Sequence, residues 1–130
     1  MTTALEALER LKEGNLRFVA GLRDDDSISN RRRVELADGQ EPFAIILGCS
    51  DSRVPAELVF DQGLGDLFVI RVAGYVVAPS QVGSVEFAAS VFGTQLVVVL
   101  GHTKCGAIEA TLSELERPQG SQSQNLKSIV

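Results

Sequence analysis

The sequence contains few of the residues that bind metals or form cross-links. Its 130 residues include two cysteines and one histidine. No Cys-x-x-Cys motif is present, which argues against a redox dithiol. The N-terminus lacks a basic segment followed by an apolar one, which argues against an export signal. We therefore expect a cytoplasmic protein whose thiols stay reduced, where thiols bind metal more often than they form disulfides.

The sequence also lacks long apolar runs and an excess of basic charge. No apolar run approaches the ~20 residues that a membrane-spanning helix needs. The net charge of −5 at pH 7 disfavours nucleic acids and anionic membranes as partners. With 45% hydrophobic residues, a chain of this length suits one domain with its own core. We expect a single domain over residues 1–130 that binds neither nucleic acid nor membrane.

Short apolar runs alternate with helical patterns along the chain. The apolar runs predict buried strands over residues 43–47, 67–70 and 95–100. Helical spacing and helix-start signals predict helices over residues 3–20, 56–60, 81–92 and 106–115. This alternation predicts an α/β fold with a mostly parallel central sheet flanked by helices.

The first predicted helix begins with a capping box, in which Thr3 is the N-cap and Glu6 lies three residues further on. Gly14 and Asn15 weaken this helix in its middle. Residues 1–21 are expected to form an N-terminal helical arm that can lie across a partner chain. The polar residues that follow are interpreted as a solvated connection with a short helix.

The C-terminal half carries two further expectations. The buried surface of the helix over residues 81–92 is expected to comprise Val82, Val85, Phe87, Ala89 and Phe92. Residues 126–130 resemble the first turn of a helix, and about five residues are too few for a stable one. We therefore expect either that the chain is a fragment, shortened at its C-terminus, or that the remaining part of the fold comes from elsewhere.

Two short polar segments, residues 48–55 and 101–106, follow apolar runs and hold both cysteines and the histidine. Sites in parallel α/β sheets lie beyond the carboxyl ends of the strands, so Cys49, His102 and Cys105 can meet at one edge. Thiolate and imidazole are ligands that zinc prefers. The three residues are thus a candidate zinc site. From spacing alone, the alternative is a pair of buried apolar thiols and a loop histidine whose hydrogen bonds are satisfied locally.

Asp51 and Arg53 lie close to the first proposed ligand in sequence. Two thiolates and one imidazole already neutralise Zn²⁺, so they acidify a bound water less than three histidines do. Asp51 can orient a hydroxide by accepting its hydrogen bond, while Arg53 keeps the carboxylate ionised. Two alternatives stay open: Asp51 takes the fourth zinc position itself, or the pair is an ordinary salt bridge in a turn.

The two segments together resemble the paired signature of the β-class carbonic anhydrases. The first reads Cys-Ser-Asp-Ser-Arg-Val-Pro from Cys49 to Pro55, and the second reads Gly-His-x-x-Cys-Gly from Gly101 to Gly106. The likeness extends from near Leu5 to the last residue. It implies a zinc lyase that interconverts carbon dioxide and bicarbonate by attack of zinc-bound hydroxide on carbon dioxide.

The resemblance also implies roles for individual residues. The zinc ligands are Cys49, His102 and Cys105, and Asp51 and Arg53 form the dyad that controls the fourth position. The residues that match substrate-pocket positions of the family are Gln40, Phe68 and Gly106. The family glutamine often reaches the pocket across a dimer interface, so a homodimer or a higher homo-oligomer is expected.

Three departures from the family qualify these expectations. The chain is shorter than family members usually are, Tyr75 stands where the family frequently has asparagine, and Ile46 stands where bicarbonate-regulated members tend to have tryptophan. Tyr75 is expected either to crowd the pocket or an interface, or to pack. Ile46 favours a constitutively open site with Asp51 off the metal. The alternative functions are a truncated, non-catalytic zinc-binding or assembly protein of the same fold, and a hydrolase of carbon disulfide or carbonyl sulfide.

Overall fold

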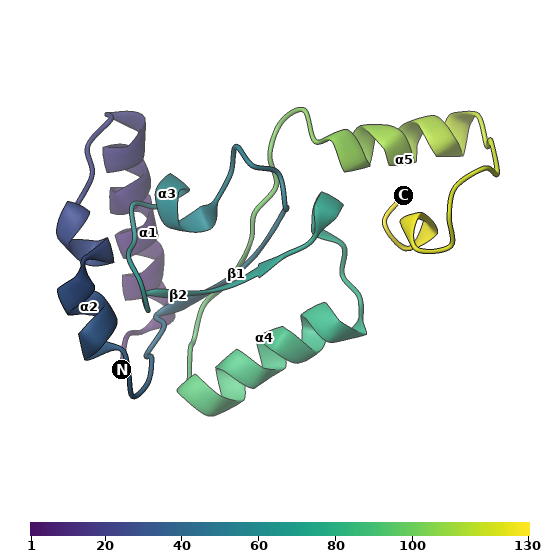
Figure 1. Cartoon of the computed structure of the whole chain (residues 1–130). Coiled ribbons are helices and arrows are strands. Elements are labelled where there is room, and N and C mark those ends of the chain that lie inside the picture. Colours follow the sequence, from purple (N-terminus) through teal and green to yellow (C-terminus); the bar gives the residue numbers. More distant parts are fainter.

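A parallel three-stranded sheet lies at the centre of the molecule (Figure 1). The computed structural model describes the backbone of residues 1–130 and every side chain except that of Asp25. The strand order is β2-β1-β3, with β1 at Ala44–Gly48, β2 at Leu67–Arg71 and β3 at Val97–Val99. Because all three strands are parallel, their carboxyl ends lie at one edge of the sheet. The parallel α/β architecture predicted from the sequence is confirmed.

Helices cover both faces of this sheet (Figure 1). Helices α1 and α3 lie on one face, α4 lies on the other, and α5 extends away from the carboxyl edge. The α-helices are α1 (Ala4–Val19), α2 (Asn30–Glu35), α3 (Ala56–Val59), α4 (Pro79–Phe92) and α5 (Gly106–Glu116). The short 3₁₀ helices are η1 (Asp25–Ile28), η2 (Ala73–Tyr75) and η3 (Leu126–Ser128).

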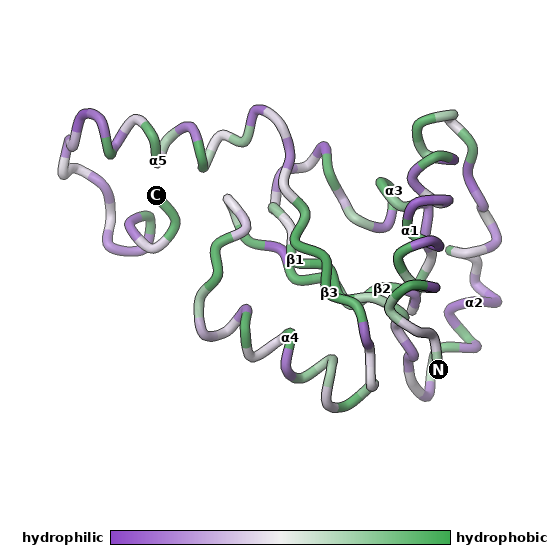
Figure 2. The backbone as a smooth tube through the Cα atoms, turned by 180° about the vertical axis from the view of Figure 1, so that it is seen from behind, coloured by the Kyte–Doolittle hydropathy of each residue, from purple (hydrophilic) through white to green (hydrophobic). Residues whose placement is uncertain are grey.

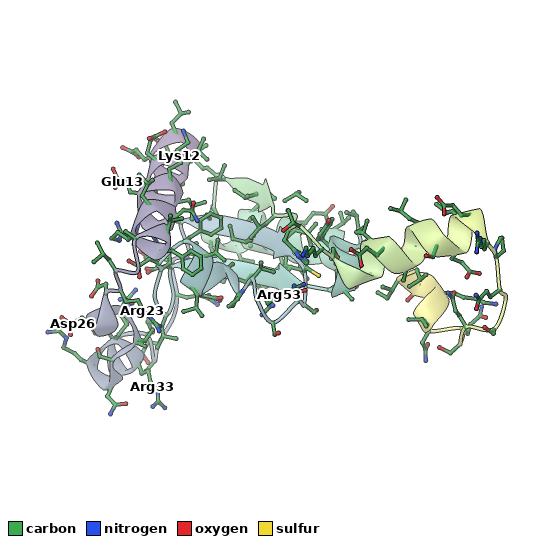
Figure 3. All side chains as sticks on the ribbon, turned by 90° about the horizontal axis from the view of Figure 1, so that it is seen from above. Lys12, Glu13, Arg23, Asp26, Arg33 and Arg53 are labelled. Atoms are coloured by element: carbon green, nitrogen blue, oxygen red, sulfur yellow. The ribbon has the colours of Figure 1, made fainter. Side chains whose placement is uncertain are left out.

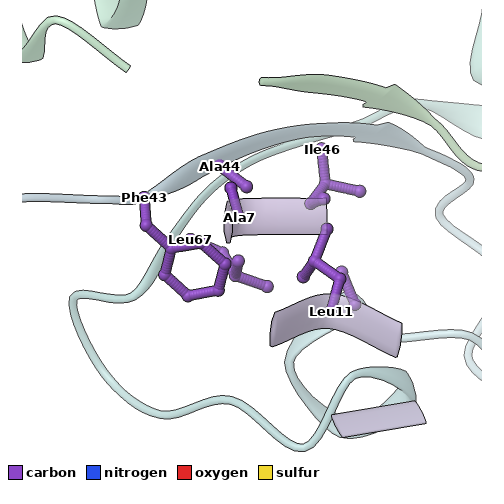
Figure 4. Close-up of a cluster of buried hydrophobic side chains, with 7 residues drawn as sticks. Ala7, Leu11, Phe43, Ala44, Ile46 and Leu67 are labelled. Atoms are coloured by element: carbon purple, nitrogen blue, oxygen red, sulfur yellow. The ribbon is translucent and has the colours of Figure 1, made fainter. Parts of the chain in front are cut away.

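Strand β1 is the centre of the hydrophobic core, and all five of its residues are buried. Ala44 and Ile46 face α1, where they pack with Ala7 and Leu11 (Figure 4). Their neighbour Ile45 points to the opposite face, as the alternation of a strand requires, and it is fully buried as well. A central strand covered on both faces has no polar side, which explains why residues 43–47 are apolar throughout.

Helix α1 begins with the predicted capping box. The Thr3 hydroxyl accepts a hydrogen bond from the Glu6 amide at 3.3 Å, and the Glu6 carboxylate accepts one from the Thr3 amide at 2.8 Å. Ala7 and Leu11 bury one stripe of the helix, while Leu5 on the opposite stripe is exposed. The helix is therefore a packed part of this fold that also presents an apolar outer surface.

Gly14 is the point at which α1 approaches the turn after α3 most closely. A Cβ atom on Gly14 would overlap the carbonyl oxygen of Phe60 and lie 2.9 Å from the Gln62 amide nitrogen. The next residue, Asn15, donates a hydrogen bond to the Val59 carbonyl at 2.9 Å. Gly14 and Asn15 thus connect α1 to the α3 segment, a role that local helix propensity does not indicate.

The Gly14→Ala substitution should therefore destabilise the protein. Alanine favours a helix interior by about 1 kcal/mol over glycine, but overpacking at a rigid contact costs about 1–3 kcal/mol or more, and we expect a net loss. Urea denaturation measures the change. Gly83→Ala is the matched control, because a Cβ atom at this α4 glycine meets nothing within 4 Å; this variant should gain stability. Equal gains for both variants would contradict the close contact.

The outer part of the sheet differs from the prediction in two ways. In α4 only Ala88 is fully buried, with Val85 and Phe92 partly buried, whereas the expected core residues Val82, Phe87 and Ala89 are exposed. Helix α4 is apolar around most of its circumference, so its sequence does not mark one inward stripe. Strand β3 is shorter than the predicted residues 95–100, and it lies at the sheet edge.

Helix α5 contacts η2 near its start and then extends away from the rest of the fold (Figure 1). None of its residues is buried, and Figure 2 shows it extending away from the green, apolar strands. The chain then turns back, and η3 lies beside α5 (Figure 1). Within the described part of the chain, no helix has the length and apolar character needed to cross a membrane.

Candidate metal centre

Three potential metal ligands converge at the carboxyl edge of the sheet. Cys49 directly follows β1, His102 follows β3, and Cys105 is the N-cap of α5. The two Sγ atoms are 3.9 Å apart, and one donor atom from each of the three residues lies within 4.8 Å of the others. Cys49 and Cys105 are 5% and 4% exposed, and the His102 side chain is 8% exposed. Strand ends far apart in sequence thus build one compact, shielded group.

His102 presents an unpartnered nitrogen to this group. Its Nδ1 lies 2.9 Å from the Thr103 carbonyl oxygen, which can only accept, so Nδ1 carries the hydrogen and donates. The neutral ring therefore has a free lone pair on Nε2. Among the described residues, buried Nε2 has no hydrogen-bond partner, an arrangement that is unfavourable for a polar atom shielded from water. A locally satisfied loop histidine does not explain this nitrogen, whereas a metal ion does.

The distance between the two sulfurs fits a zinc ion. Tetrahedral zinc with Zn–S bonds of about 2.3 Å holds two sulfurs roughly 3.8 Å apart, close to the 3.9 Å between Cys49 and Cys105. Both cysteines are free thiols. Two sulfurs and one imidazole also leave a fourth tetrahedral position for water or substrate. The residues present fit zinc in both chemistry and spacing.

The environment of Cys49 favours its thiolate. Burial by itself raises the pKa of this thiol, but interactions with His102, with the Asp51 and Gly74 amides and with Cys105 lower it from 9.0 to about 7. The Gly74 amide lies 3.3 Å from Sγ. A readily ionised Cys49 suits a metal ligand, because zinc binds the thiolate.

In the metal-free protein, Cys49 should therefore titrate near pH 7. The unfolded chain, with the ordinary thiol pKa of 9.0, binds more protons between these two values, so this group adds stability as pH rises from about 7 to 9. That contribution is absent below pH 7. Ultraviolet absorbance of the thiolate measures the titration, and Cys49→Ala should remove the transition near pH 7. The absence of any transition near pH 7 in the unmodified chain would contradict the shift.

Asp51 and Arg53 form a bidentate ion pair beside the candidate ligands. Arg53 Nε lies 2.9 Å from Asp51 Oδ1, Arg53 Nη2 lies 2.7 Å from Oδ2, and the Arg53 amide also donates to Oδ1. These bonds hold the pKa of the Asp51 carboxyl far below its usual range. Oδ2 is 4.0 Å from His102 Nε2. An ionised carboxylate thus lies beside the three candidate ligands.

Arg53 also connects the two halves of the centre. Its Nη2 donates to the Lys104 carbonyl at 3.1 Å, so the Cys49 segment is bonded to the segment that carries Cys105. Lys104 adopts a left-handed backbone with φ of 54°. Figure 3 shows Arg53 at the place where α5 meets the sheet.

The remaining predicted pocket residues lie in different places. Gly106 is the first residue of α5, beside Cys105, and a Cβ atom there would meet only open space. Phe68 pairs with Ile45 in the middle of the sheet. Its ring packs against the α4 aromatics Phe87 and Phe92, with centroids 6.2 and 5.8 Å away. Within one chain, Phe68 is not brought to the metal ligands.

Gln40 lies at the opposite end of the sheet from the metal ligands. It precedes β1, whereas Cys49 follows it. Gln40 lines a cavity of about 850 Å³ together with Phe43 and Thr94, which lie at the amino ends of β1 and β3. The structure therefore does not bring Gln40 to the metal ligands of its own chain.

Three residues at and after the end of β2 touch the centre, and the sequence assigned no role to two of them, Arg71 and Gly74. Arg71 donates to the carbonyl oxygens of Cys49 and Asp51, and the Gly74 amide donates to the Cys49 sulfur. The ring of Tyr75 lies edge-on to His102, with centroids 6.3 Å apart. Tyr75 thus packs against a candidate ligand. The sequence did contain one signal for these residues: they directly follow the predicted strand over residues 67–70, whose carboxyl end lies at the same edge of the sheet as the metal ligands.

A family model described as carbonic anhydrase matches residues 44–130, which include all three candidate ligands. The protein named carbonic anhydrase 2 of Mycobacterium tuberculosis is 52% identical over 114 residues, covering 88% of this chain and 55% of the relative. The carbonic anhydrase of Mycolicibacterium smegmatis is also 52% identical, over 110 residues, covering 85% and 53%. The chain thus spans about half the length of the curated relatives it matches.

Solved structures give the same result for the fold. The β-carbonic anhydrase of Aspergillus fumigatus superposes with a TM-score of 0.60 at 38% identity, covering 63% of this chain and 41% of the other. A β-carbonic anhydrase of Sordaria macrospora, one of two described as tetrameric, gives a TM-score of 0.60 at 33% identity, covering 65% and 45%.

Proposed function

Because the chain belongs to the β-class carbonic anhydrase family, we propose that it binds one zinc ion through Cys49, His102 and Cys105 and catalyses the reversible hydration of carbon dioxide to bicarbonate. One observation carries this proposal: the buried Nε2 of His102 has no partner among the described residues and faces two thiols whose sulfurs are 3.9 Å apart. The match to relatives named carbonic anhydrase supports the substrate and the reaction.

Each ligand is prepared for its role by the surrounding chain. Zinc, when bound, would supply the Lewis acidity that lowers the pKa of a water molecule. The hydrogen bond from His102 Nδ1 to the Thr103 carbonyl fixes the tautomer that leaves Nε2 free. The Gly74 amide stabilises the thiolate of Cys49. These contacts reduce the reorganisation that metal binding requires.

Asp51 and Arg53 are the proposed catalytic pair. Arg53 occupies both carboxylate oxygens of Asp51 and so keeps the carboxylate ionised and oriented. Oδ2, 4.0 Å from His102 Nε2, retains a lone pair that can accept a hydrogen bond from water or hydroxide at the fourth position. We propose an open site, in which Asp51 orients this nucleophile and stays off the metal.

The proposed active protein is a homo-oligomer. Gln40 lies at the amino end of β1 and cannot meet the ligands of its own chain, so it can serve the substrate pocket only from a second copy. One of the solved relatives belongs to a pair described as tetrameric. The exposed apolar stripe of α1, which includes Leu5 and Leu16, supports its proposed role as an arm that contacts a partner chain. The cytoplasmic location stays a prediction from the sequence.

The test combines metal analysis with a direct assay of hydration. The purified chain should contain about one zinc per chain, and stopped-flow measurement with a pH indicator should show hydration of carbon dioxide that chelation abolishes and zinc restores. Full zinc content without hydration at any pH would instead support the non-catalytic zinc-binding alternative. Full hydration by metal-free protein would contradict the proposal.

A further inference from the structure

We propose that Arg71 is a positioning residue of the metal centre, whose guanidinium fixes the backbone turn that carries both Cys49 and Asp51. Arg71 is the last residue of β2 and pairs with Gly48, the last residue of β1. Its Nε donates to the Cys49 carbonyl at 2.7 Å, and its Nη2 donates to the Asp51 carbonyl at 2.6 Å. This inference rests on the proposed zinc site.

One guanidinium thus holds two peptide groups that lie two residues apart. The Cys49 and Asp51 side chains leave the same backbone whose carbonyls Arg71 binds, so rotation of either peptide would move a sulfur or a carboxylate. Among the described residues, Arg71 is the side chain that donates hydrogen bonds to the carbonyl oxygens of Cys49 and Asp51. Its removal therefore leaves the direction of the turn less defined.

Neighbouring contacts extend this support along the turn. The Val72 amide donates to the Gly48 carbonyl at 3.2 Å, and the Gly74 amide donates to the Cys49 sulfur at 3.3 Å. Gly74 adopts a left-handed backbone with φ of 69°, and a Cβ atom there would lie 3.1 Å from Ala107 Cβ. The segment after β2 is therefore seated closely between the Cys49 turn and α5.

Two arginines position different parts of Asp51. Arg53 binds its carboxylate, whereas Arg71 binds its peptide carbonyl. A lysine at position 71 would keep the positive charge but would replace the planar fork by a single ammonium, which cannot reproduce two fixed N–H directions. Arg71→Lys can therefore distinguish the effect of the positive charge from the effect of the two fixed hydrogen-bond directions of the guanidinium.

The experiment measures the zinc affinity of the full chain by competition with a chromophoric chelator. Loss of contacts that orient metal ligands typically lowers metal affinity about 10–100-fold, and we expect this loss in both Arg71→Lys and Arg71→Met. Arg31→Lys is the matched control, because Arg31 lies in α2, its side chain is 77% exposed and it pairs only with Glu35 among the described residues. Its zinc affinity should equal that of the unmodified chain.

The outcomes separate positioning from charge. Wild-type affinity in Arg71→Lys would overturn the proposal, also when Arg71→Met binds zinc weakly, because the charge alone would then suffice. Circular dichroism checks that each variant is folded. If Arg71→Met fails to fold, the zinc affinity of Arg71→Lys alone tests the proposal, because lysine keeps the charge and a long aliphatic stem.

A second readout needs no metal and so separates this inference from the proposed function. In metal-free chains that carry Cys105→Ala, the single remaining thiol is Cys49. Arg71→Lys should speed its reaction with a chromogenic disulfide reagent several-fold, because the turn that shields it is loosened. If the unmodified chain binds no zinc, the proposed function fails, but the reactivity of Cys49 still tests the role of Arg71. Equal reactivity of Cys49 with and without Arg71→Lys would overturn that role.

Discussion

Cys49→Ala should weaken zinc binding by about two to three orders of magnitude. Free energies of zinc binding at four-ligand structural sites are about 10–16 kcal/mol, so one protein ligand contributes roughly 3–4 kcal/mol, or on the order of 10²–10³ in affinity. Removal of Cys49 also takes away the sulfur that lies 3.9 Å from Cys105. Hydration of carbon dioxide should fall with the zinc content, as measured by metal analysis and stopped flow on the same sample.

The neighbouring Ser50→Ala is the matched control for this substitution. Ser50 is exposed and directly follows Cys49, so its variant tests whether any change in the turn disrupts the site. It should retain about one zinc per chain and its activity. A Cys49→Ala protein that keeps one tightly bound zinc would show that the metal ligands lie elsewhere.

Asp51→Asn should separate catalysis from metal binding. Asparagine keeps the shape of the side chain but loses the charge that Arg53 binds through two hydrogen bonds. Because Asp51 is proposed to orient the nucleophile without binding zinc, zinc content should be retained. Hydration should fall about 10²-fold or more, the magnitude typical of a lost proton-accepting group. Zinc analysis and stopped-flow kinetics test the two parts together.

The chain offers a second aspartate–arginine pair as the control. Asp61 binds Arg17 at 2.6 Å, where it connects the turn after α3 to α1. Asp61→Asn should lower stability but leave the activity per zinc unchanged. If Asp51→Asn loses its zinc, Asp51 is itself a ligand; if it keeps full activity, the proposed role of the pair is wrong.

The pH dependence of hydration by the zinc-loaded chain gives an independent check on the ionised state of Asp51. Hydrogen bonds from Arg53 lower the pKa of its carboxyl, so the carboxylate is already ionised throughout the range in which carbon dioxide hydration is measured. Activity of the zinc-loaded chain should rise with pH because hydroxide forms by loss of a proton, without a separate titration of Asp51.

Local sequence patterns were sufficient for the central elements of the fold. The apolar residues 43–47 predicted a strand covered on both faces, and β1 is buried at every position. Thr3 and Glu6 predicted the start of α1, and both capping hydrogen bonds are present. These features depend on neighbours a few residues away, which the sequence contains directly.

Features that depend on distant contacts could not be predicted in this way. Gly14 lowers helix propensity, yet the close approach of the Phe60 carbonyl requires a glycine there. Helix α4 is apolar on several sides, so its pattern did not exclude Phe87 from the core, although this side chain is 53% exposed. Arg71 looks like the polar end of a strand until the carbonyls it binds are known.

For the candidate site, the sequence predicted which residues meet but not how they meet. Cys49 and His102 follow neighbouring parallel strands, so their convergence with Cys105 followed from the fold class. The tautomer of His102 and its free Nε2 depend on the Thr103 carbonyl, which only the three-dimensional structure places. Gln40 matched a pocket position by sequence, yet it lies at the far end of the sheet in its own chain.

X-ray absorption spectroscopy at the zinc edge of the zinc-loaded chain tests the central claim most directly. The geometry of Cys49, His102 and Cys105 predicts a shell of two sulfur atoms at about 2.3 Å and lighter nitrogen or oxygen ligands at about 2.0–2.1 Å. A spectrum with no sulfur, or with a single sulfur, would contradict the proposed metal centre.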